Sequence, residues 1–179
     1  MPQRNFFVTV TAVLALLLAT PAPAISPRTR TVGKFPQKVA VQFPLKGEAA
    51  GAVLQALAFD QSYGVTIGTD CGGFRLDPET GAWSQPASAG PRPPSGPLAI
   101  PAQIKATPPV KDLLAVAERD GKALIGTTRG AAYFNGTRWE YFQGREYLAD
   151  DRVVAVAFGD NGDLWLGSAR GVTRVSYVP

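Results

Sequence analysis

Residues 153–175 read Val-Val-Ala-Val-Ala-Phe-Gly-Asp-Asn-Gly-Asp-Leu-Trp-Leu-Gly-Ser-Ala-Arg-Gly-Val-Thr-Arg-Val, and this stretch decides the fold class. An apolar run precedes a polar turn, and a second apolar run ends in a Gly-Ser pair with another glycine shortly after it. The first run has apolar residues on both faces, which is typical of a strand covered on both sides. The Asn-Gly pair favours the positive φ of a tight hairpin. The stretch therefore predicts three antiparallel strands.

The same pattern occurs twice more along the chain. Residues 113–133 repeat it with the pair Gly126-Thr127, and residues 53–76 repeat it in a more divergent form, with an additional residue expected between the two glycines. Alternating segments at 82–84 and 138–142 predict an outer fourth strand in these two copies. Repeats of a few tens of residues are typical of propellers and solenoids, in which each unit buries its apolar face against its neighbours.

The third copy resembles the two-component-regulator propeller repeat, in which an Asp/Gly turn leads into Leu-Trp-Ile-Gly-Thr and then a further glycine. The matching residues are Asp160, Gly162, Leu164, Trp165, Gly167 and Gly171. The resemblance implies an all-β fold, a β-propeller-like array of four-stranded antiparallel blades. Propellers typically have four to eight blades, whereas about three repeats are recognisable here, so the array could be incomplete. Exposed blade edges could then join copies into a homo-oligomer.

The repeats divide the chain into six parts. These are a signal peptide (1–24), an N-terminal arm or closing strand (25–50), a first blade-like repeat (51–85), a Pro-rich surface loop (86–109), a second repeat (110–148), and a third repeat without its own outer strand (149–179). The loop holds eight prolines, which remove backbone donors and favour extended, exposed chain.

The N-terminal residues have the features of an export signal. Arg4 precedes the apolar run 6–20, and the small residues of 21–24 suit a signal peptidase, so we expect cleavage after Ala24 and a secreted or periplasmic protein. The alternative is an uncleaved membrane anchor, although fifteen apolar residues fall short of the roughly twenty that a spanning helix needs.

The composition excludes several kinds of chemistry. The chain has no histidine, which removes Ser-His-Asp and Cys-His nucleophilic sites and His-ligated metals. The only cysteine, Cys71, cannot form an intramolecular disulfide or a structural zinc site, and its place in a glycine-rich turn predicts a small buried residue. We predict no cofactor, no metal and no nucleic-acid partner. Carboxylates at 150–151 and at 160 and 163 could form an acid–base pair, but each pair is explained by a turn.

The second turn of each repeat carries the candidate ligand-binding residues. Asp70, Arg129 and Arg170 lie in these turns, and binding on a propeller usually belongs to loops at one end of the channel. The guanidinium groups could pair with carboxylates or sulfates of a glycan. Three tryptophans, Trp83, Trp139 and Trp165, could stack on sugars, although their strand positions favour packing between blades. The predicted structural turn residues are Gly68, Gly126, Gly130, Asn161, Gly162, Gly167 and Gly171.

The resemblance implies the extracytoplasmic sensor portion of a receptor, frequently for carbohydrate. We therefore expect an exported, non-enzymatic ligand-binding, sensor or interaction module whose partner is an oligosaccharide or a protein. One alternative is a secreted polysaccharide-active enzyme, or a remnant of one, that uses carboxylates. Another is a structural assembly piece.

Overall fold

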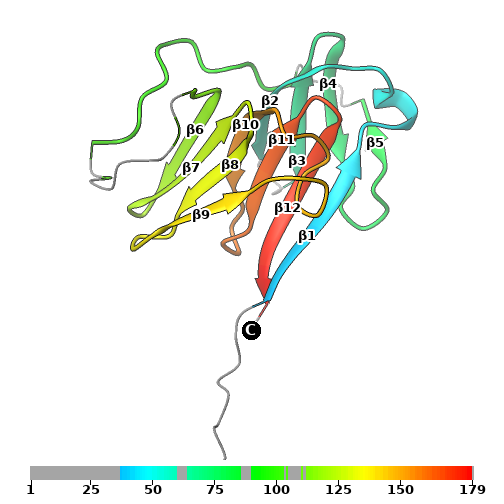
Figure 1. Ribbon diagram of the computed structural model, residues 1–179. Coiled ribbons are helices and arrows are strands. Elements are labelled where there is room, and N and C mark those ends of the chain that lie inside the picture. Colours follow the sequence, from blue (N-terminus) through cyan, green and yellow to red (C-terminus); the bar gives the residue numbers. More distant parts are fainter. Residues whose placement is uncertain are drawn as a thin grey trace, which may run out of the picture. The chain divides into compact units, whose positions relative to one another are not determined.

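Three four-stranded antiparallel sheets form the described part of the protein in a computed structural model (Figure 1). The structure describes residues 37–59, 64–85, 90–102, 104, 110 and 112–178, so the predicted signal peptide lies outside the described residues. The first sheet contains β2 (Leu54–Phe59), β3 (Val65–Thr69), β4 (Gly72–Leu76) and β5 (Trp83–Ser84). The second contains β6 (Ala115–Arg119), β7 (Lys122–Thr127), β8 (Gly130–Phe134) and β9 (Trp139–Phe142). The third contains β10 (Val153–Phe158), β11 (Leu164–Ser168), β12 (Gly171–Val178) and β1 (Gln37–Pro44). The predicted fold class is confirmed.

The third sheet takes its outer strand from a distant part of the sequence. β1 pairs antiparallel with β12 over its whole length (Figure 1). On β1, Phe43 is 5% exposed and its ring stacks on Trp165 of β11, with 5.9 Å between the ring centroids. The indole of Trp83 donates a hydrogen bond of 3.0 Å to the carbonyl of Pro44. A short 3-10 helix, Gly47–Ala49, then leads toward the first sheet.

The second turn of every sheet is built in the same way. A side-chain hydroxyl donates a hydrogen bond to the carbonyl of the glycine three residues later. The three pairs are Thr69 and Gly72, Thr127 and Gly130, and Ser168 and Gly171. Each glycine has a φ between +121° and +157°, a conformation that side chains other than glycine rarely adopt. Because Thr69 pairs with Gly72 and not with Gly73, the additional residue expected in the first copy is wrong.

The first turns of the second and third sheets differ. In the second sheet Asp120 and Gly121 both have positive φ, as a two-residue hairpin turn of type I′ requires. In the third sheet the predicted hairpin turn joins β10 to β11, but only Gly162 of the Asn161-Gly162 pair has positive φ, so the turn is not of type I′. The reason is a longer loop, closed by a hydrogen bond of 2.8 Å from the Gly159 N–H to the Asp163 carbonyl.

Glycines at the ends of the middle strands let neighbouring sheets approach closely. β10 contacts β2 of the first sheet and both β6 and β7 of the second. A Cβ atom on Gly126 would lie 2.5 Å from the Val153 carbonyl oxygen, and one on Gly167 would lie 2.9 Å from a methyl group of Leu54. The repeated glycine is therefore the point where the next sheet packs, because no larger residue fits there.

In the first sheet the equivalent place is filled by the Pro-rich segment. A Cβ on Gly68 would lie 1.8 Å from the carbonyl oxygen of Pro91. Farther along the same segment, Ile104 is 8% exposed and packs in a cluster with Ala123 and Phe134 of the second sheet. The segment thus contacts the first sheet near one end and the second sheet near the other, and it buries part of its own chain in addition to forming surface.

Glu140 on β9 connects the second sheet with the third. Its carboxylate accepts hydrogen bonds from Lys38 Nζ (2.6 Å), the Tyr177 hydroxyl (2.9 Å) and Asn135 Nδ2 (3.0 Å), and its side chain is 9% exposed. Burial alone would raise the pKa of Glu140, but these donors outweigh burial and keep the pKa below its usual value. Burial, followed by the hydrogen bond to Glu140, raises the pKa of Tyr177.

We expect Glu140→Gln to lower the free energy of unfolding at pH 7 by about 1.5–3 kcal/mol, because charge-assisted hydrogen bonds are lost. A carboxyl group whose pKa is lowered by folding stabilises the protein only while it is ionised. The difference in the free energy of unfolding between variant and wild type should therefore shrink as the pH falls below 4.5, the ordinary pKa of a glutamate side chain. Urea denaturation at neutral and acidic pH measures it. The exposed Glu146 provides the control substitution Glu146→Gln, for which little change is expected.

Candidate ligand-binding site

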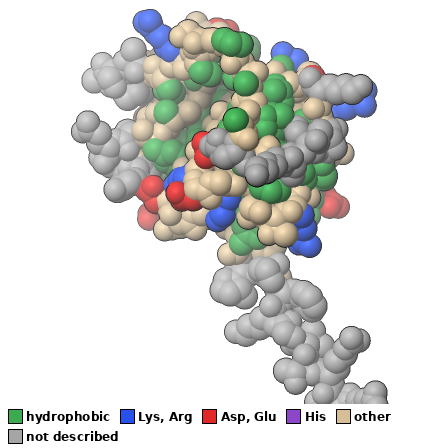
Figure 2. Space-filling model, turned by 90° about the vertical axis from the view of Figure 1, so that its left-hand side faces the viewer, with side chains coloured by type: hydrophobic (Ala, Val, Ile, Leu, Met, Phe, Trp, Pro, Cys, Tyr) green, Lys and Arg blue, Asp and Glu red, His purple; other side chains and the backbone are tan. Residues whose placement is uncertain are grey.

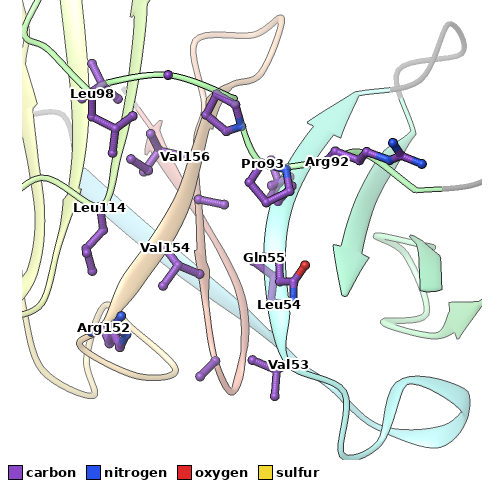
Figure 3. Close-up of a pocket in the computed structure, with 18 residues that line it drawn as sticks. Val53, Leu54, Gln55, Arg92, Pro93, Leu98, Leu114, Arg152, Val154 and Val156 are labelled. Atoms are coloured by element: carbon purple, nitrogen blue, oxygen red, sulfur yellow. The ribbon is translucent and has the colours of Figure 1, made fainter. Parts of the chain in front are cut away.

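A cavity of about 500 Å³ lies where the first strands of the three sheets come together, and we call it the central cavity (Figure 3). Its walls come from the beginnings of these three strands, β2, β6 and β10, from the residue before each of them, and from the Pro-rich segment. The lining residues are Val53 to Leu57, Leu114 to Val116, Arg152, Val154 to Val156, Ala169, Arg92, Pro93, Pro94, Gly96 and Leu98. Small-molecule sites in proteins have volumes of about 300–1,000 Å³. The central cavity is therefore large enough for a small organic ligand.

The lining of the central cavity is mainly apolar. Valine, leucine, alanine and proline supply most of it, and no Asp or Glu belongs to the described residues that line it. The polar side chains are Gln55, Arg92 and Arg152. Figure 3 shows the Arg92 side chain directed away from Val154. The lining can bind an apolar body and an anionic group, but it holds no carboxylate for acid–base catalysis.

The three residues predicted to bind ligand do not line the central cavity. The Asp70 carboxylate accepts a hydrogen bond of 2.8 Å from the Val53 N–H, which fixes the start of β2 against the second turn. Arg170 lies with its Nε 3.5 Å from a carboxylate oxygen of Asp150. Arg129 lines a different cavity in the second sheet. The structure therefore does not gather the three into one site around this cavity.

The cavity that contains Arg129 is polar, and we call it the second cavity. Its volume is about 590 Å³. Its lining residues are Val110, Asp112, Thr127, Thr128, Arg129, Gly130, Ala131, Tyr141 and Gln143. Tyr141 is 44% exposed, which leaves much of its ring open to solvent. Asp112 accepts hydrogen bonds from the hydroxyl and the N–H of Thr128, and these lower its pKa in that order. An exposed ring beside charged and amide groups suits a polar ligand.

Three of the four carboxylates that the sequence offered for catalysis have structural partners. Asp150 accepts a hydrogen bond of 2.9 Å from the N–H of Arg152 and also pairs with Arg170. Asp151 accepts a hydrogen bond of 2.7 Å from a backbone N–H. A carboxylate oxygen of Asp163 lies 4.0 Å from Nε of Arg174. These contacts agree with the interpretation of the carboxylates as turn residues.

The structure tests the predicted packing of the tryptophans and the predicted burial of Cys71. Trp83 and Trp165 are 6% and 5% exposed in a core cluster that contains residues of the first and third sheets, so the prediction of packing between blades is confirmed for these two. Trp139 packs on Phe134 of its own sheet, with 5.3 Å between the ring centroids. The prediction that Cys71 is buried is wrong, because its turn exposes it. Within the described ranges we find no group of three potential metal ligands. The same ranges hold no helix that is long and apolar enough to span a bilayer.

Sequence reasoning missed Arg152 as a residue of the central cavity. Arg152 immediately precedes β10, and the equivalent positions in the other repeats are Val53 and Asp112, each three residues before an alanine paired with the repeat glycine. An alignment of the repeats through those alanines would have identified the position. It would not have identified the Pro-rich wall, because that segment lies outside the repeat pattern.

Comparisons with known proteins give similarity to solved structures only. No family model matches the chain, and no curated protein matches it. The extracellular domain of a proposed hybrid two-component system from B. thetaiotaomicron is 18% identical to this chain. The match covers 74% of this chain and 16% of that domain, with a TM-score of 0.32. A second such domain from B. thetaiotaomicron is 14% identical, and the match covers 74% of this chain and 15% of that domain, with a TM-score of 0.32. A streptogramin B lyase is 12% identical, and the match covers 75% of this chain and 40% of the lyase, with a TM-score of 0.31. The chain thus spans less than half the length of each.

Proposed function

We propose that the protein is an exported, non-enzymatic binding module that holds a small ligand in the central cavity. The observation that carries this proposal is the composition of that cavity, whose walls come from three sheets and whose described lining contains no carboxylate. Residues 1–24, with the features of a signal peptide, support export. The proposal of binding without catalysis rests on the same lining, together with the absence of histidine from the chain.

The walls of the central cavity are held in place before any ligand binds. Leu54 and Ala56 on β2 and Ala155 on β10 are all less than 7% exposed. Each belongs to a strand paired within its sheet. Fixed walls reduce the ordering cost of binding, so affinity does not depend on closing a loop over the ligand.

Filling the central cavity should abolish binding. Gln55 is an exposed residue of β2 that lines this cavity, so we expect Gln55→Trp to occupy ligand space while leaving the core intact. With anilinonaphthalene sulfonate as a fluorescent anionic probe, the variant should bind at least about tenfold more weakly, which corresponds to about 1.4 kcal/mol. Titrations followed by fluorescence measure the affinity, and thermal unfolding checks the fold.

The matched control is Gln143→Trp, which introduces the same side chain at an exposed residue of the second cavity. We expect this variant to bind the probe as the wild type does. If Gln55→Trp keeps full affinity, or if only Gln143→Trp loses it, the central cavity is not the binding site.

A second candidate function is recognition of an oligosaccharide in the second cavity. The observation in its favour is the exposed ring of Tyr141 beside Arg129 and Gln143, which offers a stacking surface together with hydrogen-bond donors. The same pair of tryptophan variants tests it with acidic and neutral oligosaccharides in place of the probe. This candidate requires weaker binding by Gln143→Trp and unchanged binding by Gln55→Trp. Association with a protein or with further copies of the chain stays a prediction.

A further inference from the structure

The central cavity has an apolar end and a cationic end. Figure 3 shows Leu98, Pro93 and Val156 toward one end, where the Pro-rich segment passes β10. Arg152 and Val53, which precede β10 and β2, lie toward the other end. An elongated ligand with one charged end would match this arrangement.

The three repeats differ in how the residue before the inner strand contacts the second turn. In the first sheet Asp70 accepts a hydrogen bond from the N–H of Val53, and in the second Asp112 accepts from Thr128. These contacts join the residue before the inner strand to the second turn. In the third sheet the equivalent residues are Arg152 and Ala169, and an alanine side chain has no acceptor.

No ion pair joins the guanidinium of Arg152 to another residue in the described ranges. The neighbouring carboxylate of Asp150 accepts a hydrogen bond from the backbone of Arg152 and pairs with the side chain of Arg170 instead. Arg152 is exposed, so its charge faces solvent at the border of an apolar cavity. A planar guanidinium without a partner binds a carboxylate or a sulfonate through two parallel hydrogen bonds.

We infer that the central cavity binds a small anionic amphiphile, with its anionic group at Arg152 and its apolar body toward Leu98 and Val156. This inference rests on the proposed function and specifies the ligand class of the same site. Burial of the apolar body against valine, leucine and proline supplies affinity, while the guanidinium fixes the orientation. A neutral sugar fits this cavity poorly, because no aromatic side chain belongs to its described lining.

The test compares decanoate with decanol, which share an apolar chain and differ in charge. We expect the wild-type chain to bind decanoate at least about tenfold more tightly than decanol, measured by isothermal titration calorimetry below the concentration at which either aggregates. Arg152→Gln should bind the two ligands with similar affinity, and its affinity for decanol should match that of the wild type. The hydrogen bond from Arg152 to Asp150 uses the backbone N–H, so the glutamine variant can keep it.

Arg170→Gln is the matched control, because it removes an arginine that already pairs with Asp150. This variant should retain the preference for decanoate. The inference is overturned if Arg152→Gln binds decanoate as the wild type does, or if the wild type shows no preference for it. If neither amphiphile binds, and Gln55→Trp weakens the fluorescent probe whereas Arg152→Gln binds that probe as the wild type does, Arg152 does not hold an anionic group, so the inference fails and the proposed function stands. If Gln55→Trp has no effect either, both fail.

Discussion

Replacing Phe43 by alanine is expected to lower the free energy of unfolding by about 3–5 kcal/mol, the usual cost of removing a buried phenylalanine. Phe43 is the residue of β1 that enters the core, where it is 5% exposed and stacks on Trp165. Because many domains are stable by only about 5–15 kcal/mol, this single change should remove a large part of the total. Urea denaturation followed by tryptophan fluorescence measures it.

Val39→Ala is the control for this prediction, since Val39 lies on the same strand but is 42% exposed. It should change stability by less than about 1 kcal/mol. Equal effects of the two substitutions would mean that Phe43 contributes no more than a surface residue does. The pairing of β1 with β12 would then have little part in holding the third sheet together.

Gly130→Ala is expected to cost about 2–5 kcal/mol through two separate effects. Gly130 has a φ of +121°, and an alanine in the left-handed region costs about 1–2 kcal/mol. A Cβ at this position would also lie 2.2 Å from the carbonyl oxygen of Phe142 on the neighbouring strand, and such overpacking costs about 1–3 kcal/mol more. Thermal and urea denaturation measure the combined loss.

Gly136→Ala separates the two effects. Gly136 also has a positive φ, of +99°, but a Cβ there would meet no atom within 4 Å. This variant should therefore lose only the conformational part, about 1–2 kcal/mol. A Gly136→Ala loss as large as that of Gly130→Ala would show that close approach to β9 is unimportant at the second turn.

The repeat pattern predicted the sheets because each of its features has a local cause. The hydroxyl of Thr127 closes the second turn on Gly130, and Gly126 allows the close approach of Val153. These requirements depend on a few neighbouring residues, so the sequence shows them directly. Residues 153–158 are apolar on both faces of the strand, which likewise predicted neighbours on both sides, and β10 contacts both other sheets.

The candidate site was harder to predict because it depends on packing between distant segments. Asp70 and Arg170 were singled out for their places in equivalent turns, but both make contacts within the protein, with Val53 and Asp150. The wall formed by the Pro-rich segment could not be predicted, since proline composition indicates an extended chain without saying which surface it contacts. Cys71 was misjudged because a glycine-rich turn does not specify which side chains face solvent.

The most direct measurement of the central claim is a titration of isotope-labelled protein with decanoate, followed by amide chemical shifts in heteronuclear NMR. Binding in the central cavity predicts the largest shifts at residues 53–57, 114–116 and 152–156, which line it or lie beside its lining. The largest shifts at residues 127–131 and at Tyr141 would instead assign the ligand to the second cavity. Such a result, or shifts confined to neither cavity, would contradict the assignment of the central cavity as the ligand site.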